Sequence, residues 1–257
     1  VDSFYSLLKH QDEITDLIFI HGADIRLEDT QFREILSQRI RDVAERFGKN
    51  IIEIETNIRE LLDPYVNWAV LGHGAALAAT GHLLSPDFCR IYIASSHTWP
   101  NLTPWGSHPD LDPLWSSDTL EFIHDGFEVT RVNKVALITK YDIALENLRV
   151  CNNTPVSAYN CGTCEKCVRT MINLKVNNSL NKCPAFDQDL ELKNVLKMGA
   201  HDENIRLLIK ENLDALEKSE GDIELINALR KVLNKPVWPY KFKKRLKKIR
   251  KKLKKRF

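Results

Sequence analysis

The stretch from Cys151 to Cys167 reads C-N-N-T-P-V-S-A-Y-N-C-G-T-C-E-K-C and contains four of the six cysteines of the chain. Thiolates separated by two residues can reach one tetrahedral ion from a single turn. Gly162 stands where such a turn needs a residue that tolerates positive φ. We therefore predict a Zn²⁺ site whose four ligands are Cys151, Cys161, Cys164 and Cys167; disulfides or buried thiols are the alternative. A closed four-thiolate site stabilises structure and leaves no coordination position for a substrate.

Length and composition allow one large domain or one domain with an appendage. The chain has 257 residues, of which 43% are hydrophobic, enough to form a substantial core. It contains no run of 18 apolar residues, so no membrane-spanning helix is predicted. No secretory signal pattern is present. Cysteines clustered at metal-binding spacing favour a reducing compartment, and we predict a cytoplasmic location.

Charge is distributed unevenly along the chain. Residues 241–257 contain twelve Lys or Arg and no acidic residue, whereas the rest of the chain has 25 basic and 35 acidic residues. An apolar stripe runs through this tail at helical spacing: Phe242, Leu246, Ile249, Leu253 and Phe257. We expect the tail to contact an anionic membrane surface or an acidic partner. Nucleic acid is a weaker option because the body is acidic, and a solvated, disordered tail is the plain alternative.

Apolar periodicity predicts an α/β fold with a largely parallel sheet flanked by helices. A helix is expected from Val1, followed by alternating strands and helices. The expected strands are 14–21 (a buried one), 50–55, 90–95 and 127–129, and the expected helices are 30–47, 58–65, 67–84, 118–124, 133–141, 143–148 and 166–176. In open parallel sheets, ligands bind at the carboxyl ends of the strands.

A helical extension follows the α/β part of the chain. From Leu190 to Leu233 the period is helical, and Gly199 and Gly221 divide it into three helices. We predict an α/β domain at 1–185 that includes the zinc knuckle, a helical extension at 186–238 and a basic amphipathic tail at 239–257.

Polar residues gather at two predicted strand ends, His21-Gly22 and Ser95-Ser96-His97. The long loop 98–117 follows the second and contains four prolines and three tryptophans, which favours a functional loop. His108 and Asp112 in this loop are candidates for acid–base chemistry or a second metal, although Asp often serves only to form turns. Its tryptophans, Trp99, Trp105 and Trp115, are candidates for a stacking wall, or alternatively form a small core.

His73 is a further candidate, because Gly72 and Gly74 beside it allow close backbone approach. His82 falls on the opposite face of the same predicted helix, so the two cannot form a ligand pair.

The opening V-D-S-F-Y-S-L-L resembles the second half of the S-G-G-x-D-S motif of the PP-loop ATP pyrophosphatase superfamily. The cysteine pattern, with Cys151 before C-G-T-C-E-K-C and Arg169 after it, is similar to that of 7-cyano-7-deazaguanine (queuosine precursor) synthase-like members. The resemblance covers about residues 1–175. It implies a Rossmann-like (HUP-type) sheet. In that superfamily a strand and S-G-G come before the D-S pair; both are missing from this sequence, and whether S-G-G precedes Val1 is left open.

This resemblance also implies an ATP site with Mg²⁺ at the carboxyl edge of the sheet. Asp2 and Ser3 match the motif and would contact phosphate or Mg²⁺; capping of the first helix is their plain alternative. The resemblance places His21 and Gly22 near adenine, and His73, Gly74 and Ser96 along the nucleotide and substrate. Arg169 would face phosphates or flank the zinc. The loop around G-S-H-P-D-L-D-P-L-W departs from the synthase pattern, so the deazaguanine substrate is not carried over.

The function expected from these residues is that of an ATP-dependent ligase or amidase-like enzyme. It would form AMP and pyrophosphate by adenylating a carboxylate or carbonyl of a small molecule, with His108 and Asp112 beside Asp2 and Ser3 as catalytic candidates. The alternatives are a non-catalytic zinc-stapled binding protein on the same fold, and an RNA-modifying PP-loop enzyme. The substrate remains open, as does the oligomeric state, for which a homodimer is one option.

Overall fold

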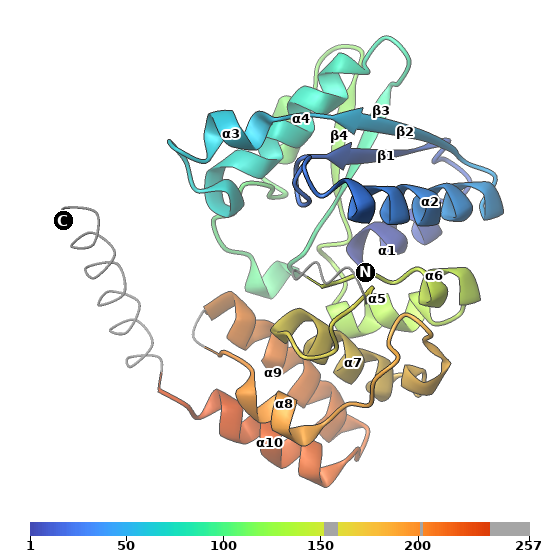
Figure 1. Ribbon diagram of the computed structural model, residues 1–257. Helices are drawn as coiled ribbons and strands as arrows, with labels where there is room; N and C mark the ends of the chain where they lie inside the picture. The colour runs from blue at the N-terminus through green and yellow to red at the C-terminus, as the bar shows by residue number, and fades with distance from the viewer. Residues whose placement is uncertain (152–158, 201–202, 237–257) are drawn as a thin grey trace, which may run out of the picture.

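The computed structural model describes residues 1–151, 159–200 and 203–236 (Figure 1). The basic tail, residues 241–257, lies outside this part of the chain, and its membrane, acidic-partner and nucleic-acid options remain predictions. The strands and the helices around them are β1 (Asp16–His21), β2 (Asn50–Glu55), β3 (Arg90–Ala94), β4 (Glu121–Asp125), α1 (Asp2–Lys9), α2 (Thr30–Arg46), α3 (Ile58–Leu62), the π-helix η1 (Trp68–Gly72) and α4 (His73–Leu83).

The second half of the described chain is helical. Its elements are α5 (Arg131–Ile138), α6 (Asp142–Glu146), α7 (Glu165–Val176), the short 3₁₀ turn η4 (Leu180–Lys182), α8 (Leu192–Lys197), α9 (Glu203–Lys218) and α10 (Ile223–Leu233). Two further 3₁₀ turns, η2 (Trp99–Asn101) and η3 (Asp112–Trp115), lie between β3 and β4. No helix in the described ranges is long and apolar enough to cross a bilayer.

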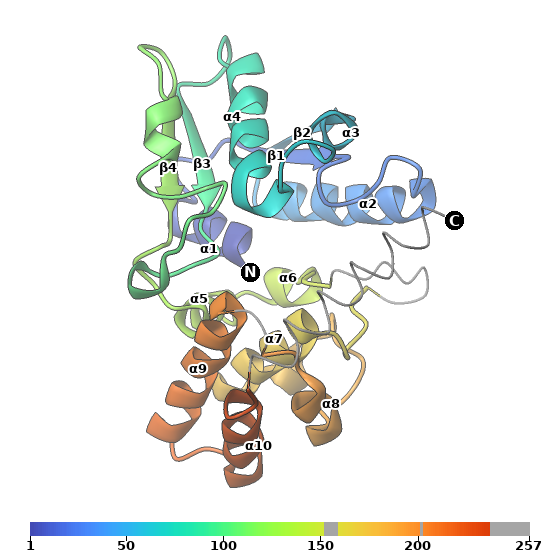
Figure 2. The same ribbon diagram turned by 90° about the vertical axis from the view of Figure 1, so that its left-hand side faces the viewer.

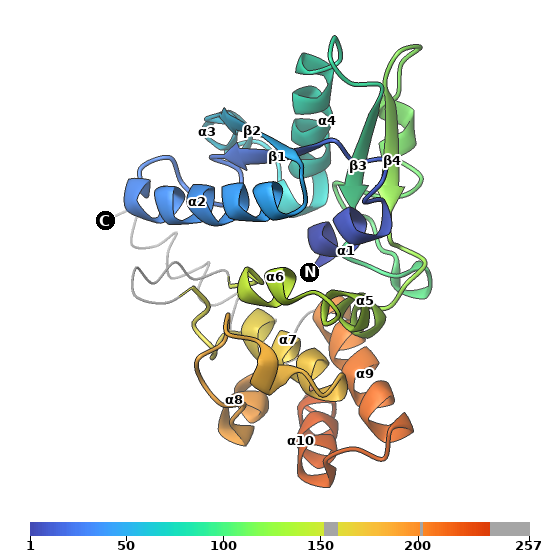
Figure 3. The same cartoon turned by 90° about the vertical axis from the view of Figure 1, so that its right-hand side faces the viewer.

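The strands form two parallel pairs. β1 pairs with β2 in the register Asp16 to Asn50, and β3 pairs with β4 in the register Arg90 to Glu121. Helix α2 packs along the first pair, while α4 runs beside the second (Figures 2 and 3). The expectation of an α/β fold with parallel strands is confirmed, but the described strands form two separate two-stranded sheets instead of the one largely parallel sheet that was expected. The HUP-type identity of the sheet stays a prediction.

The segment 118–125 corrects one expectation. Residues 118–124 were expected as a helix and 127–129 as a strand, but the strand is β4 and residues 127–129 form a turn. Leu120, Phe122 and His124 are buried, whereas Glu121 and Ile123 between them are less so. This period of two is the strand pattern. Phe122 packs with Ile93 of β3 and Ala78 of α4.

β1 is half-buried along most of its length, where its apolar run predicted a buried strand. The packing explains this partial burial. Phe19 of β1 contacts a cluster formed by Ile25, Phe32 and Leu36, and this cluster covers the face of the strand pair that α2 packs against. An apolar run therefore does not by itself report burial on both faces.

The helical half has its own core, and α7 belongs to both parts. Met171 and Leu174 of α7 pack with Leu8 of α1 and with the segment around Cys151. Val168 and Ile172, also on α7, pack against α8, α9 and α10. The three expected helices after Leu190 are confirmed: α8 and α9 pack on the α7 helix that leaves the cysteine knuckle, and α10 packs on α8 and α9 (Figure 1).

Candidate functional site

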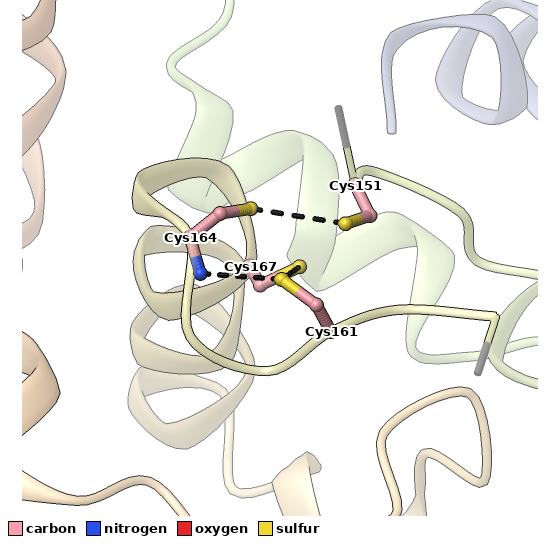
Figure 4. A group of neighbouring side chains, drawn as sticks. All are labelled: Cys151, Cys161, Cys164 and Cys167. Atoms are coloured by element: carbon pink, nitrogen blue, oxygen red, sulfur yellow. Dashed lines mark hydrogen bonds between the residues drawn. The ribbon is translucent and has the colours of Figure 1, made fainter. Parts of the chain in front are cut away.

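The four predicted metal ligands converge in the structure (Figure 4). Their Sγ atoms all lie within 4.8 Å of one another. The Sγ atoms of Cys151 and Cys164 are 3.9 Å apart, as are those of Cys161 and Cys167. Zinc–sulfur bonds of about 2.3 Å at tetrahedral angles place sulfurs about 3.8 Å apart. The cluster could therefore hold a metal ion such as zinc.

The knuckle is shaped by Gly162 and Asn160. Gly162 has φ +66°, and a Cβ there would meet the Gln188 side chain at 1.8 Å. Asn160 is 1% exposed; its Oδ1 accepts the backbone N–H groups of Val150 and Cys151, at 3.0 and 3.2 Å. The Nδ2 group of Asn160 donates to the carbonyls of Leu148 and Ala185, at 2.8 and 2.9 Å. One amide thus joins three segments around the cysteines.

A cavity lies at the carboxyl ends of β3 and β4, where the sequence predicted a ligand site. It is small: the centre of a water-sized sphere can occupy about 20 Å³, within about 300 Å³ of non-atom space that includes open solvent. Four of the candidate residues line it, namely His73, Ser96, Trp105 and His108, whereas Trp99 and Trp115 do not. The other lining residues are Ala94, Ser95, His97, Leu102, Thr103, Ser107 and His124. Trp105 presents its ring edge-on to His73 and His97, with centroids 5.9 and 5.6 Å apart.

Asp112 lies behind this cavity and is fully buried, at 0% exposure. Its Oδ2 accepts the Ser107 hydroxyl at 2.6 Å and lies 2.6 Å from Nδ1 of His124. Its Oδ1 accepts the backbone N–H of His108 at 3.3 Å. Asp112 therefore orients three residues of the cavity wall and does not itself line the cavity. His108 accepts a hydrogen bond on Nδ1 from the N–H of Asp110, at 3.2 Å.

Gly74 allows the loop to approach helix α4. A Cβ on Gly74 would lie 1.6 Å from the carbonyl oxygen of Gly106. His73 is fixed beside this contact by a 3.2 Å hydrogen bond between Nδ1 and the Trp68 carbonyl. The backbone that lies close to Gly74 is therefore that of the loop 98–117. A position of Gly74 beside a nucleotide remains a prediction.

Asp2 lies in a buried ion-pair cluster at the start of α1. Its carboxylate accepts from Arg131 at 2.6 Å and from Lys134 at 3.3 Å. Burial would raise the pKa of Asp2, but Arg131 and Lys134 outweigh it and lower that pKa to about 2. Lys134 also donates to the Ser95 carbonyl at 2.6 Å. The start of α1 is therefore connected to the strand end that forms the cavity.

Arg169 lies in the first turns of α7 and is 3% exposed. Its Nε donates to Glu165 at 2.6 Å. Its Nη1 and the Nε of Arg131 have no hydrogen-bond partner within the described residues. The two guanidinium groups act on each other: Arg169 contributes, after burial, to lowering the pKa of Arg131.

The structure does not bring Ser3, His21 and Gly22 to the cavity lining. Ser3 is exposed on α1. His21 is buried at the end of β1, where Nε2 lies 2.9 Å from Glu53 and Nδ1 accepts from Arg33 at 3.1 Å. Gly22 has φ +90° and forms the turn after β1. Their predicted roles near ATP remain untested.

Helix α9 of the extension braces the loop 98–117. The Glu211 carboxylate accepts from Thr98 Oγ1 at 2.9 Å, from Asn101 Nδ2 at 3.2 Å and from the backbone N–H of Arg131 at 3.2 Å. Thr103 adds a 3.1 Å hydrogen bond to Asn204. The extension therefore fixes both the cavity wall and the start of α5.

Sequence reasoning missed His124, Arg131, Lys134, Asn160 and Glu211. His124 was hidden because its segment was expected to be helical; read as a strand, it ends in the polar pair His124-Asp125. Arg131 and Lys134 of α5 belong to no sequence motif. Their pairing with Asp2 depends on α5 lying against α1, which the sequence does not reveal. No family of known proteins, no curated protein and no solved structure matches this chain.

Proposed function

We propose that the chain is an ATP-dependent ligase of the PP-loop type that releases AMP and pyrophosphate. The observation that carries the proposal is the pair of guanidinium groups of Arg131, whose side chain is partly buried, and Arg169, which is buried. Each has an N–H without a partner in the described structure, and both lie near the cluster that joins α1 to the Ser95 strand end.

Phosphate binding would account for these unpartnered donors. Buried donors without acceptors are costly, and two guanidinium groups close together repel each other. A bound phosphate oxygen relieves both penalties, and arginine suits it because its N–H groups form a planar fork. The N-terminus of α1 lies in the same cluster and adds the positive end of a helix dipole.

The residues divide into two groups in this proposal. Arg131, Arg169 and Lys134 would bind phosphate oxygens of ATP, and Asp2 would hold these cations in place or contact Mg²⁺. An uncharged part of the second substrate would enter the cavity that Trp105 lines. Zn²⁺ at the four cysteines would be structural and would fix the start of α7, on which Arg169 lies. A cytoplasmic location agrees with thiolate ligands.

The test uses ATP labelled in the α-phosphate. The full chain is incubated with ATP, Mg²⁺ and pools of small carboxylic acids and ammonia, and the nucleotides are separated. Label in AMP with matched pyrophosphate supports the proposal, and label in ADP excludes it. Arg169→Gln should weaken ATP·Mg²⁺ binding at least tenfold in calorimetry. Arg230→Gln is the matched control, because Arg230 is exposed and pairs only with Glu217 in the described structure.

A non-catalytic binding protein on the same fold is the second candidate. Its support is the pairing of Asp2 with Arg131 and Lys134, which already compensates two of the cations. Absence of heat with ATP·Mg²⁺, together with unaltered thermal stability, would favour this candidate. RNA modification would instead appear as RNA binding with a steep salt dependence.

A further inference from the structure

We propose that the cavity at the ends of β3 and β4 binds an uncharged ligand group carrying an N–H or O–H, and that Nε2 of His124 accepts its hydrogen bond. His124 lines the cavity and is buried. Its Nε2 has no hydrogen-bond partner in the described part of the chain. This inference stands independently of ATP use.

The hydrogen bonds of Asp112 define which nitrogen of His124 carries the proton. A carboxylate only accepts, and Asp112 Oδ2 faces both the Ser107 hydroxyl and His124 Nδ1 at 2.6 Å. Nδ1 therefore donates to Asp112, and the neutral ring has its lone pair on Nε2. A buried histidine held by a carboxylate in this way is oriented as a proton acceptor.

The lining of the cavity favours an uncharged group over an ion. Hydroxyl-bearing residues form much of the wall, namely Ser95, Ser96, Thr103 and Ser107. The only ionisable side chains in the lining are histidines, and burial, followed by Arg131, lowers the pKa of His97. Asp112 is covered by the residues it orients. An anion in the cavity would face the lone pair on Nε2 of His124 and would find no Lys or Arg in the lining to pair with. A cation would find no carboxylate in the lining to pair with.

The experiment records long-range ¹H–¹⁵N spectra of the full chain labelled with ¹⁵N-histidine at pH 8. His124→Gln assigns the resonance. We expect a protonated Nδ1 and an unprotonated Nε2 in the free protein. Formamide and formate serve as probes of equal size that differ in charge and in N–H content. Formamide should shift the Nε2 resonance saturably, and formate should shift it at least fivefold less at equal concentration.

Three variants separate this role from a structural one. Asp112→Asn should change the tautomer ratio of His124 and abolish the formamide response. Ser107→Ala removes one donor to Asp112 but leaves the Asp112–His124 contact, so both signatures should persist even if stability falls. Arg230→Gln, at an exposed residue of α10 that pairs with Glu217, is the control and should change neither. A protonated Nε2 in the neutral ring, an equal response to formate, or no response to formamide would each overturn the proposal.

Discussion

Asn160 shows how much one side chain contributes to the cysteine knuckle. Replacing it with alanine leaves four buried backbone groups without their partner: two N–H donors and two carbonyl acceptors. Each such loss costs about 1–3 kcal/mol. We expect Asn160→Ala to lower the free energy of unfolding by at least ~2 kcal/mol in urea titration. Asn50→Ala, at an exposed position of β2, should change it by less than ~0.5 kcal/mol.

The lowered pKa of Asp2 predicts that the free energy of unfolding falls at acidic pH. Its folded pKa of about 2 lies below the ordinary 3.8, so the unfolded chain binds the proton first as pH falls. The stabilisation is therefore complete above about pH 4 and is lost as pH falls towards 2, by about 2 kcal/mol in total. Asp2→Asn should flatten this part of the curve of unfolding free energy against pH. An unchanged slope in the variant would show that other carboxylates cause it.

At the scale of single residues, the sequence predicted the residues that could bind a metal or line the cavity better than it predicted the side chains that hold them in place. The cysteines were predictable because tetrahedral coordination imposes a spacing that is visible in the chain. Ser96 and His108 were predictable because residues at strand ends and in the following loop meet at one edge, and His73 because the glycines beside it allow a close backbone approach. Asn160 and Glu211 could not be found, since a buried amide or carboxylate acts on backbone groups that are distant in sequence.

The cysteine cluster, which could hold a metal ion, is the feature whose loss should lower stability most visibly. Cys151 follows α6, whereas Cys167 lies within α7, so an ion between them would fix these segments to each other. We expect one zinc per chain by elemental analysis. Cys164→Ser should lower both zinc content and melting temperature. Cys89→Ser, at an exposed cysteine outside the cluster, should leave both unchanged. Full zinc content in Cys164→Ser would contradict the four-thiolate site.

Helices were predicted more reliably than the last strand. The helices at 30–47 and 166–176 have long apolar periods, and the structure reproduces both within about one residue. β4 is as short as β3, but it reads E-F-I-H-D and has only two apolar residues, Phe122 and Ile123, too few to separate a period of two from one of 3.6. Its identity as a strand depends on pairing with β3, which is information from elsewhere in the chain.

The molecule as a whole couples the helical extension to the cavity through Glu211. Glu211→Ala removes the acceptor of Thr98, Asn101 and the Arg131 backbone. We expect faster hydrogen exchange over residues 98–105, by at least tenfold, because these amides would open more readily. Glu217→Ala, on the same helix and paired with exposed Arg230, is the control. Equal exchange in the two variants would show that α9 does not stabilise the loop.

The connection between β3 and β4 is itself the wall of the cavity. In the first pair, helix α2 joins the two strands, but in the second the crossover is the segment 95–120, with only short 3₁₀ turns. Parallel pairing anchors both ends of this segment to neighbouring backbones. A molecule entering the cavity therefore meets a preorganised receptor, so that little entropy is lost on binding and selectivity rests on shape and hydrogen-bond polarity.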